Sequence, residues 1–211
     1  MKAILFDLDG TLTDSGEGIM NCAQLALEHY GIHVENRDDL RVFVGPPLQK
    51  TFYEFGVPRE EVDHAIEIYR SRYIPIGKYE NSPYPGIREL LQRLRDDGHK
   101  LYVATSKPET TSLEILNHFD MTKYFDLVCG ASFDASRHSK AMVIAHLLEQ
   151  TGRHPDTVMV GDTAFDVLGA REHGIPTVGV SWGYGEVADM EAAGAAAIAH
   201  TMEELYRLLT K

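Results

Sequence analysis

The sequence predicts an α/β protein with a doubly wound, mainly parallel sheet and an all-helical insert. Short and nearly continuous apolar runs recur along its 211 residues, a pattern typical of strands buried on both faces of a parallel sheet. Helical patterns separate the later runs, as expected for strand–helix alternation. The long interval between the first and second runs contains helical patterns but no convincing strand, which indicates an insert.

Five apolar runs are the predicted strands, and they cover residues 3–6, 101–104, 125–129, 157–160 and 176–180. Leucine and isoleucine side chains repeat at helical spacing over residues 87–94, and apolar side chains do so again over 141–148. The last predicted helix begins with a capping box formed by Thr201 and Glu204.

The insert is predicted to cover residues 15–83, which leaves residues 1–14 and 84–211 for the α/β core. Gly45 and Pro46 separate its shorter helical patches and predict a stiff loop, with an ordinary interhelical turn as the alternative. Two longer patterns each present an apolar helical face. Their apolar residues are Ile19, Ala23, Ala26, Leu27 and Tyr30 in one, and Val62, Ala65, Ile66, Tyr69 and Tyr73 in the other.

The amino-acid composition and net charge limit the binding partners and the cellular compartment that we expect for this protein. The net charge of −12, without clustered basic residues, argues against binding to nucleic acid or to an anionic membrane. The longest apolar run, residues 192–199, is too short to span a bilayer. Cys22 and Cys129 are far apart and suit small buried side chains in a reducing compartment, and the ten histidines form no ligand cluster. Without a secretory leader pattern, a cytoplasmic location is expected.

Three short motifs suggest other chemistries and fail on context. A calcium loop that starts at Asp7 would need glycine and glutamate where the chain has Leu12 and Gly18. The G-x-S-x-G match around Ser181 leaves almost no later sheet to carry the acid and histidine of a serine hydrolase. The G-x-G-x-x-A match over 183–188 lacks the following acidic residue of a dinucleotide site and indicates a glycine-rich loop at the rim of the sheet.

A stronger signal comes from the residues that follow the predicted strands. In an open α/β sheet, ligands bind at the carboxyl ends of the strands. The residues expected there carry carboxylates, hydroxyls and a lysine. They are Asp7 and Asp9 after the first strand, Thr105 and Ser106 after the second, Lys140 beyond the third, and Asp162 and Asp166 after the fourth. A divalent cation with a phosphate group is the ligand set that suits all of them.

These residues resemble the four motifs of the haloacid dehalogenase superfamily. The matching segments are Phe-Asp-Leu-Asp-Gly-Thr-Leu-Thr-Asp-Ser at the start, Ala-Thr-Ser-Lys-Pro at 104–108, Lys140, and Gly-Asp-Thr-Ala-Phe-Asp at 161–166. The likeness covers essentially the whole chain, in the right order. The helical insert after the first motif is similar to the cap of the phosphoglycolate phosphatase-like branch. The resemblance therefore implies a Rossmann-like core and a phosphatase with an inserted helical cap.

The resemblance also implies a role for each motif residue. Asp7 would be the nucleophile that forms an aspartyl-phosphate, and Asp9 the general acid and base. Mg²⁺ would be held by Asp7, Asp9 through its backbone carbonyl, and Asp162.

The other motif residues would support this reaction. Phosphate oxygens would be bound by Thr105 and by backbone amides near Leu8, Gly10 and Ser106, with Lys140 neutralising charge. Arg137 is the alternative to Lys140. Asp166 would orient metal-bound water or Lys140, and the cap residues Gly45 and Pro46 are candidates for specificity.

The expected substrate is a small phosphorylated metabolite, with phosphoglycolate as the first choice. A 5′-nucleotidase, a sugar-phosphate phosphatase and a phosphoglucomutase-like phosphotransferase are alternatives within the superfamily. A catalytically silent phosphate-binding protein or a receiver-like module is the non-enzymatic alternative, although a receiver domain is smaller and lacks the insert. The protein is expected to act as a monomer or homodimer, away from nucleic acid and membranes.

Overall fold

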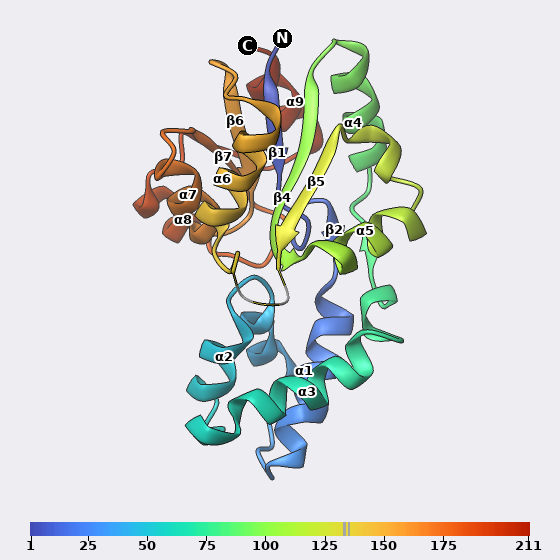
Figure 1. The fold of residues 1–211 in the computed structure, drawn as a ribbon, viewed down its shortest axis with the longest axis vertical. Helices are drawn as coiled ribbons and strands as arrows, with labels where there is room; N and C mark the ends of the chain where they lie inside the picture. Colours follow the sequence, from blue (N-terminus) through green and yellow to red (C-terminus); the bar gives the residue numbers. More distant parts are fainter. Residues whose placement is uncertain (133, 135) are drawn as a thin grey trace. The chain divides into compact units, whose positions relative to one another are not determined.

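The computed structural model describes residues 1–132, 134 and 136–211, which form two compact units (Figure 1). Met1–Thr13 and Pro83–Lys211 form one unit, here called the sheet unit. Asp14–Ser82 form the other, called the helical unit. Two short strands, β2 (Thr13–Asp14) and β3 (Ser82–Pro83), pair where the chain passes from one unit to the other.

The sheet unit contains a six-stranded sheet in the order β5-β4-β1-β6-β7-β8, and every neighbouring pair is parallel. This confirms the predicted fold class. The strands are β1 (Ala3–Phe6), β4 (Lys100–Pro108), β5 (Leu127–Ala131), β6 (Thr157–Gly161), β7 (Thr177–Val180) and β8 (Ala197–Ala199). β4, which corresponds to the strand predicted over 101–104, is longer than predicted because it continues past Ala104 through an irregular pairing with β5.

Strand order reverses between β1 and β6. From β1 the chain adds β4 and then β5 on one side, and it returns to add β6, β7 and β8 on the other. In the register of the sheet, Phe6 lies beside both Val103 and Val160. The residues that follow β1, β4 and β6 therefore meet at the position where open α/β sheets bind ligands.

Helices cover both faces of the sheet because side chains alternate along each strand. Ile4 and Phe6 face a core shared with α4 (Ile87–Asp96), α5 (Glu109–His118) and α9 (Met202–Thr210). Ala3 and Leu5 face the opposite core. That core is formed with α6 (Lys140–Thr151) and α7 (Ala164–Arg171). α8 (Val187–Ala193) packs on α7. The sheet unit also contains a short 3₁₀ turn (Thr122–Tyr124). Half of the predicted capping box is confirmed: the Thr201 hydroxyl accepts a hydrogen bond from the Glu204 amide, whereas the Glu204 carboxylate accepts one from the His200 amide and not from the Thr201 amide.

The helical unit consists of α1 (Gly16–His29), α2 (Leu48–Glu54), α3 (Val62–Tyr73) and the 3₁₀ turns Arg37–Phe43, Arg59–Glu61 and Gly77–Tyr79. The apolar faces predicted for its long helices are buried, except that Tyr30 is half-buried and follows the end of α1. Arg72 and Glu80 tie α3 to the end of the unit through two hydrogen bonds of 2.7 Å. Within the described part of the chain, no helix is both long enough and apolar enough to cross a membrane.

Candidate active site

The loop after β1 folds back on itself beside β6. The Asp7 amide donates to the Val160 carbonyl at 2.9 Å, so Asp7 continues the strand. The Leu8 carbonyl then accepts hydrogen bonds from the Leu12 and Thr13 amides, and the Leu8 side chain is fully buried. Gly10 has a φ of 76°, and a Cβ atom there would lie 2.1 Å from Asp162 Oδ2. Only glycine allows this loop to pass so close to Asp162.

Lys140 joins two buried carboxylates. Its Nζ lies 2.8 Å from Asp7 Oδ1 and 2.8 Å from Asp166 Oδ1, and it donates to the Ala104 carbonyl at 2.9 Å. Burial alone would lower the pKa of Lys140, but the two carboxylates outweigh it and raise that pKa, so the ammonium stays charged. Gly169 gives this side chain room, because a Cβ there would lie 2.7 Å from Lys140 Cβ.

Asp162 follows β6 and is 1% exposed. Its Oδ1 accepts a hydrogen bond from Thr11 Oγ1 at 3.0 Å, and its Oδ2 accepts one from the Tyr184 amide at 2.8 Å. Burial, with further contributions from the charges of Asp166 and Asp7, raises the pKa of Asp162 to about 8. The carboxylates of Asp7, Asp162 and Asp166 together therefore hold more negative charge than their hydrogen bonds compensate.

Asp166 is also fully buried, but its partners lie within the protein. Its Oδ2 accepts hydrogen bonds from the Thr163 hydroxyl at 2.8 Å and from the Thr163 amide at 3.1 Å, which completes the capping box of α7. Its other oxygen faces Lys140. Asp166 therefore orients Lys140 and fixes the start of the helix that follows Asp162.

The carboxylates of Asp7, Asp162 and Asp166 fit a divalent cation that prefers oxygen ligands. One oxygen of each lies within 4.8 Å of the others, and all three residues are buried. Lys140 supplies one positive charge to these three acids, and burial raises the pKa of Asp7 as well as that of Asp162. A donor set of buried carboxylates with unbalanced negative charge is typical of Mg²⁺ sites.

Asp9 has a partner that the sequence analysis did not identify. Lys107 Nζ lies 2.6 Å from Asp9 Oδ2, and both side chains are mostly buried. The other oxygen, Asp9 Oδ1, is buried and accepts no hydrogen bond from the described residues. A lone lysine after a strand gives no indication of which carboxylate it will meet, so only the fold identifies this pair.

The predicted phosphate-binding groups lie along the same edge of the sheet. Thr105 is buried, hydrogen-bonds to the Asp7 carboxylate, and accepts from the Lys107 amide at 3.2 Å. Ser106 follows it and is half-buried. The Leu8 amide donates to Asp7 Oδ1 at 2.7 Å, and the Gly10 amide donates to the Thr13 carbonyl at 2.9 Å. Both amides thus have partners within the protein, and their contact with phosphate stays a prediction.

Other candidate residues lie elsewhere. Arg137 donates to Glu109 Oε2 at 2.8 Å and to the Gly130 carbonyl at 2.6 Å, whereas Lys140 is the residue beside Asp7. Gly45 and Pro46 lie in the helical unit, between the 3₁₀ turn Arg37–Phe43 and α2.

The rim motif around Ser181 forms a serine–histidine contact. Ser181 Oγ lies 2.9 Å from His200 Nδ1. The nearby Glu204 carboxylate accepts a hydrogen bond from the His200 backbone amide at 2.8 Å. In a serine-hydrolase triad, the third member is an acid that orients the imidazole ring of the histidine. Glu204 accepts from the His200 backbone amide and not from its ring, so it does not fill that role.

The motif order along the chain matches a known family. The model of the family described as haloacid dehalogenase-like hydrolase matches residues 4–180. The tyrosine-protein kinase PtkA of Mycobacterium tuberculosis is 44% identical over 99% of this chain and 72% of its own length. The 5′-nucleotidase of Pseudomonas aeruginosa is 41% identical over 90% of this chain and 86% of its own.

More distant relatives and solved structures agree with this assignment. The phosphoglycolate phosphatase of Agrobacterium fabrum is 32% identical over 89% of this chain and 83% of its own length. The crystal structure of a predicted phosphatase from Clostridium acetobutylicum superposes with a TM-score of 0.94 at 40% identity. That comparison covers 99% of this chain and 97% of the other.

The close approach of the 183–185 loop to Asp162 yields a prediction. A Cβ atom on Gly183 would lie 2.3 Å from Asp162 Cβ and Oδ2. Gly183→Ala should therefore displace the loop and break the hydrogen bond from the Tyr184 amide to Asp162. We expect that amide to exchange with solvent at least about tenfold faster in NMR hydrogen exchange, since a broken bond of this kind is worth about 1.5–3 kcal/mol.

Gly194→Ala is the matched control. Gly194 has a φ of 96° and no atom within 4 Å of its Cβ position, so alanine strains the backbone without touching Asp162. Unchanged exchange of the Tyr184 amide in Gly183→Ala would contradict the proposed contact.

Proposed function

The chain belongs to the haloacid dehalogenase-like hydrolase family and is a phosphatase, and we propose that it hydrolyses a small phosphomonoester through a phosphorylated Asp7. The observation that supports this most directly is the position of Asp7. It lies at the strand-order reversal, 2.8 Å from the Lys140 ammonium and beside Asp162.

In the first step, a carboxylate oxygen of Asp7 forms a bond to phosphorus as the ester P–O bond breaks. Asp9 gives its proton to the departing alkoxide oxygen. In the second step, Asp9 takes a proton from water as the water oxygen attacks phosphorus, and inorganic phosphate leaves with Asp7 restored. Lys107 Nζ lies 2.6 Å from Asp9 Oδ2 and stabilises the carboxylate form of Asp9, which exists between the two steps and takes the proton from water.

Charge control is divided among the surrounding residues. Asp7, Asp162 and the backbone carbonyl of Asp9 would hold Mg²⁺, which when bound offsets the repulsion between the Asp7 carboxylate and the phosphate oxygens. Lys140, 2.8 Å from Asp7 Oδ1, neutralises part of the same charge. The Thr105 hydroxyl and the Leu8, Gly10 and Ser106 amides would bind phosphate oxygens. Their present partners would be exchanged for substrate.

A nucleoside 5′-monophosphate is the substrate we place first, ahead of phosphoglycolate. The 5′-nucleotidase relative is 41% identical, whereas the phosphoglycolate phosphatase relative is 32% identical. We assign the helical unit the role of a cap that limits the size of the substrate, with Gly45 and Pro46 in its loop. This role rests on the resemblance of the insert to the caps of the family.

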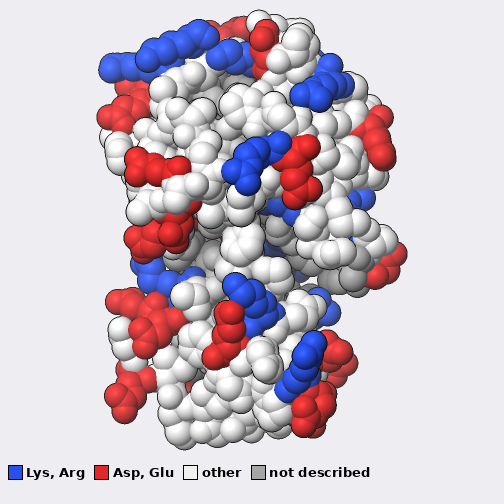
Figure 2. Space-filling model, turned by 90° about the vertical axis from the view of Figure 1, so that its left-hand side faces the viewer, with Lys and Arg blue, Asp and Glu red and all other residues white. Residues whose placement is uncertain are grey.

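Surface charge favours a small substrate over nucleic acid. On the face drawn in Figure 2, Lys and Arg side chains are interleaved with Asp and Glu side chains. The net charge of the chain is −12. A surface of this kind does not supply the basic field that concentrates nucleic acid.

Phosphoryl transfer to tyrosine is the second candidate function, because the relative at 44% identity is named a tyrosine-protein kinase. Asp7 would take a phosphoryl group from a nucleoside triphosphate, which leaves as the diphosphate, and phosphorylated Asp7 would pass that group to a phenol oxygen whose proton goes to Asp9. The same residues would serve both reactions, so the acceptor distinguishes them.

Asparagine substitutions test the two aspartates. Asp7→Asn should lower the turnover of an aryl phosphate at least about a thousandfold, because an amide is a poor nucleophile. Asp9→Asn should lower it at least about a hundredfold, by removing the general acid and base. Asp156→Asn is the control, because Asp156 is exposed and precedes β6 at the other end of the sheet. Activity above a few per cent in Asp7→Asn would exclude the covalent route.

Metal removal tests the cation. Turnover should vanish in excess chelator and return on addition of Mg²⁺ alone. Ca²⁺ should inhibit, because it prefers more and longer bonds to oxygen and would draw both oxygens of Asp7 away from phosphorus. Full turnover in chelator would overturn the metal assignment while leaving the family assignment intact.

A direct comparison of substrates tests specificity. We expect kcat/KM for a nucleoside 5′-monophosphate to exceed that for phosphoglycolate and for a phosphotyrosine peptide by at least about tenfold, a difference of about 1.4 kcal/mol. Preference for phosphoglycolate would reverse the order of the two small substrates. Preference for hydrolysing the peptide would support a phosphoprotein substrate, whereas phosphotyrosine formed from ATP would support transfer to protein.

A further inference from the structure

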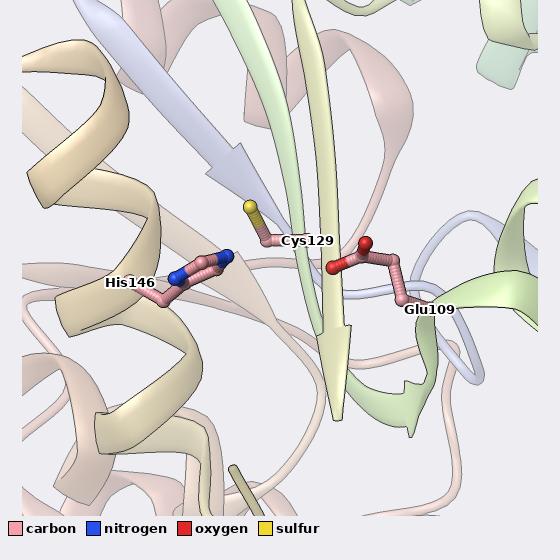
Figure 3. A group of neighbouring side chains, drawn as sticks. All are labelled: Glu109, Cys129 and His146. Carbon is pink, nitrogen blue, oxygen red and sulfur yellow. The ribbon is translucent and has the colours of Figure 1, made fainter. Parts of the chain in front are cut away.

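A second cluster of metal-ligating side chains lies outside the residues proposed for catalysis. Glu109 at the start of α5, Cys129 on β5 and His146 on α6 each offer one ligand atom, and these atoms lie within 4.8 Å of one another. Figure 3 shows His146 and Glu109 directed toward the strand that carries Cys129. The fold brings together three residues that are widely separated in the sequence.

The Glu109 carboxylate is held in place by its neighbours. Its Oε2 accepts hydrogen bonds from Arg137 at 2.8 Å and from the Gly130 amide at 3.2 Å. A Cβ on Gly130 would lie 2.5 Å from the Lys107 carbonyl, so glycine is needed for this approach. With Oε2 fixed in this way, Oε1 can serve as a ligand. Outer hydrogen bonds of this type orient the ligands of protein metal sites.

Gln150 connects the other two ligands. It is one turn after His146 on α6, and its amide nitrogen lies 2.8 Å from His146 Nε2 and 3.9 Å from Cys129 Sγ. A flip of the Gln150 side-chain amide would exchange its nitrogen and oxygen and place the oxygen at the same position. That oxygen can then accept a hydrogen bond from the protonated Nε2 while Nδ1 binds a metal, or it can serve as a fourth ligand.

The chemistry of Cys129 argues against a role as a nucleophile or redox sensor. Burial and the Glu109 charge raise the pKa of this thiol to about 11, in spite of Arg137. Reactive cysteines have a lowered pKa and an accessible thiolate, and Cys129 is 1% exposed. A bound metal ion would give the thiolate a stable partner.

We propose that Cys129, His146 and Glu109 form a binding site for Zn²⁺ or a similar borderline transition-metal ion, distinct from the carboxylate site. Thiolate and imidazole ligands select such ions over Mg²⁺. On binding, Cys129 releases its proton to solvent. The thiolate, the Glu109 carboxylate and the Arg137 guanidinium together then leave one negative charge for the ion.

The geometry requires only a small adjustment. Zinc–ligand bonds of about 2.0–2.3 Å in a tetrahedron place ligand atoms roughly 3.5 Å apart. The atoms of this cluster lie within 4.8 Å of one another, so rotations that shorten these separations by about 1 Å close the site. Residues of β5, α5 and α6 are already packed together around it.

Binding of Co²⁺ tests the proposal without any substrate. The full-length protein is stripped of metal and titrated with Co²⁺ in a large excess of Mg²⁺, which occupies oxygen ligands only. We expect a thiolate-to-cobalt charge-transfer band that saturates at one Co²⁺ per chain and is bleached by Zn²⁺. A folded wild-type protein without this band would overturn the site, whatever its phosphatase activity.

Two cysteine variants locate the thiolate. Cys129→Ser should abolish the band, and Cys22→Ala should retain it, because Cys22 is the other buried cysteine and lies in the helical unit. If Cys129→Ser fails to fold, His146→Gln replaces it as the test, with an expected loss of at least about tenfold in Co²⁺ affinity. A band that survives Cys129→Ser, or unchanged affinity in His146→Gln, would exclude the proposed ligands.

Discussion

The buried contact of Lys140 with Asp7 and Asp166 is the interaction on which the candidate active site depends. It draws together β1, the first turn of α6 and the first turn of α7. Two buried carboxylates in contact with one ammonium are stable only when the geometry is close, because desolvation of each charge costs several kcal/mol. Ser139, whose hydroxyl accepts from the Met142 amide, caps α6 and thereby fixes the position of Lys140.

Glycine makes the close packing around these charges possible. A Cβ on Gly161 would lie 2.3 Å from Asp166 Cγ, and one on Gly185 would lie 2.2 Å from the Asp162 carbonyl oxygen. Gly10 and Gly183 likewise bring backbone close to the Asp162 side chain, and Gly169 brings backbone close to Lys140. The Tyr184 amide can then reach Asp162 directly. Backbone donors at such sites are fixed before substrate arrives, which is the condition for electrostatic catalysis.

Sequence alone predicted the part of this site that depends on strand ends. Asp7 and Asp162 directly follow apolar runs, Lys140 lies a few residues beyond another, and the carboxyl ends of parallel strands share one edge of a sheet. The Lys107–Asp9 pair was not predictable, because it depends on which strand neighbours β1 and on the irregular end of β4. The proximity of Cys129 and His146 depends in the same way on the packing of α6 against β5. Helical patterns could be recognised in the insert, but its 3₁₀ turns carry no strong periodic signal.

The irregular end of β4 connects the two proposed sites. Ala104 pairs with Cys129 and Pro108 pairs with Ala131, so the β4 segment between them is longer than the β5 segment it faces. Extra residues in a strand redirect side chains, and such irregularities are frequent beside active sites. Here the extra length places Lys107 against Asp9 and delivers Glu109, just beyond Pro108, to the Cys129 cluster. The irregular pairing of β4 with β5 therefore places one residue in each proposed site. Lys107 positions Asp9 in the candidate active site, and Glu109 contributes a carboxylate to the Cys129 cluster. Because the two donor sets differ in chemistry, thiolate and imidazole favour a transition-metal ion at the Cys129 cluster, whereas carboxylates suit Mg²⁺ at the other proposed site.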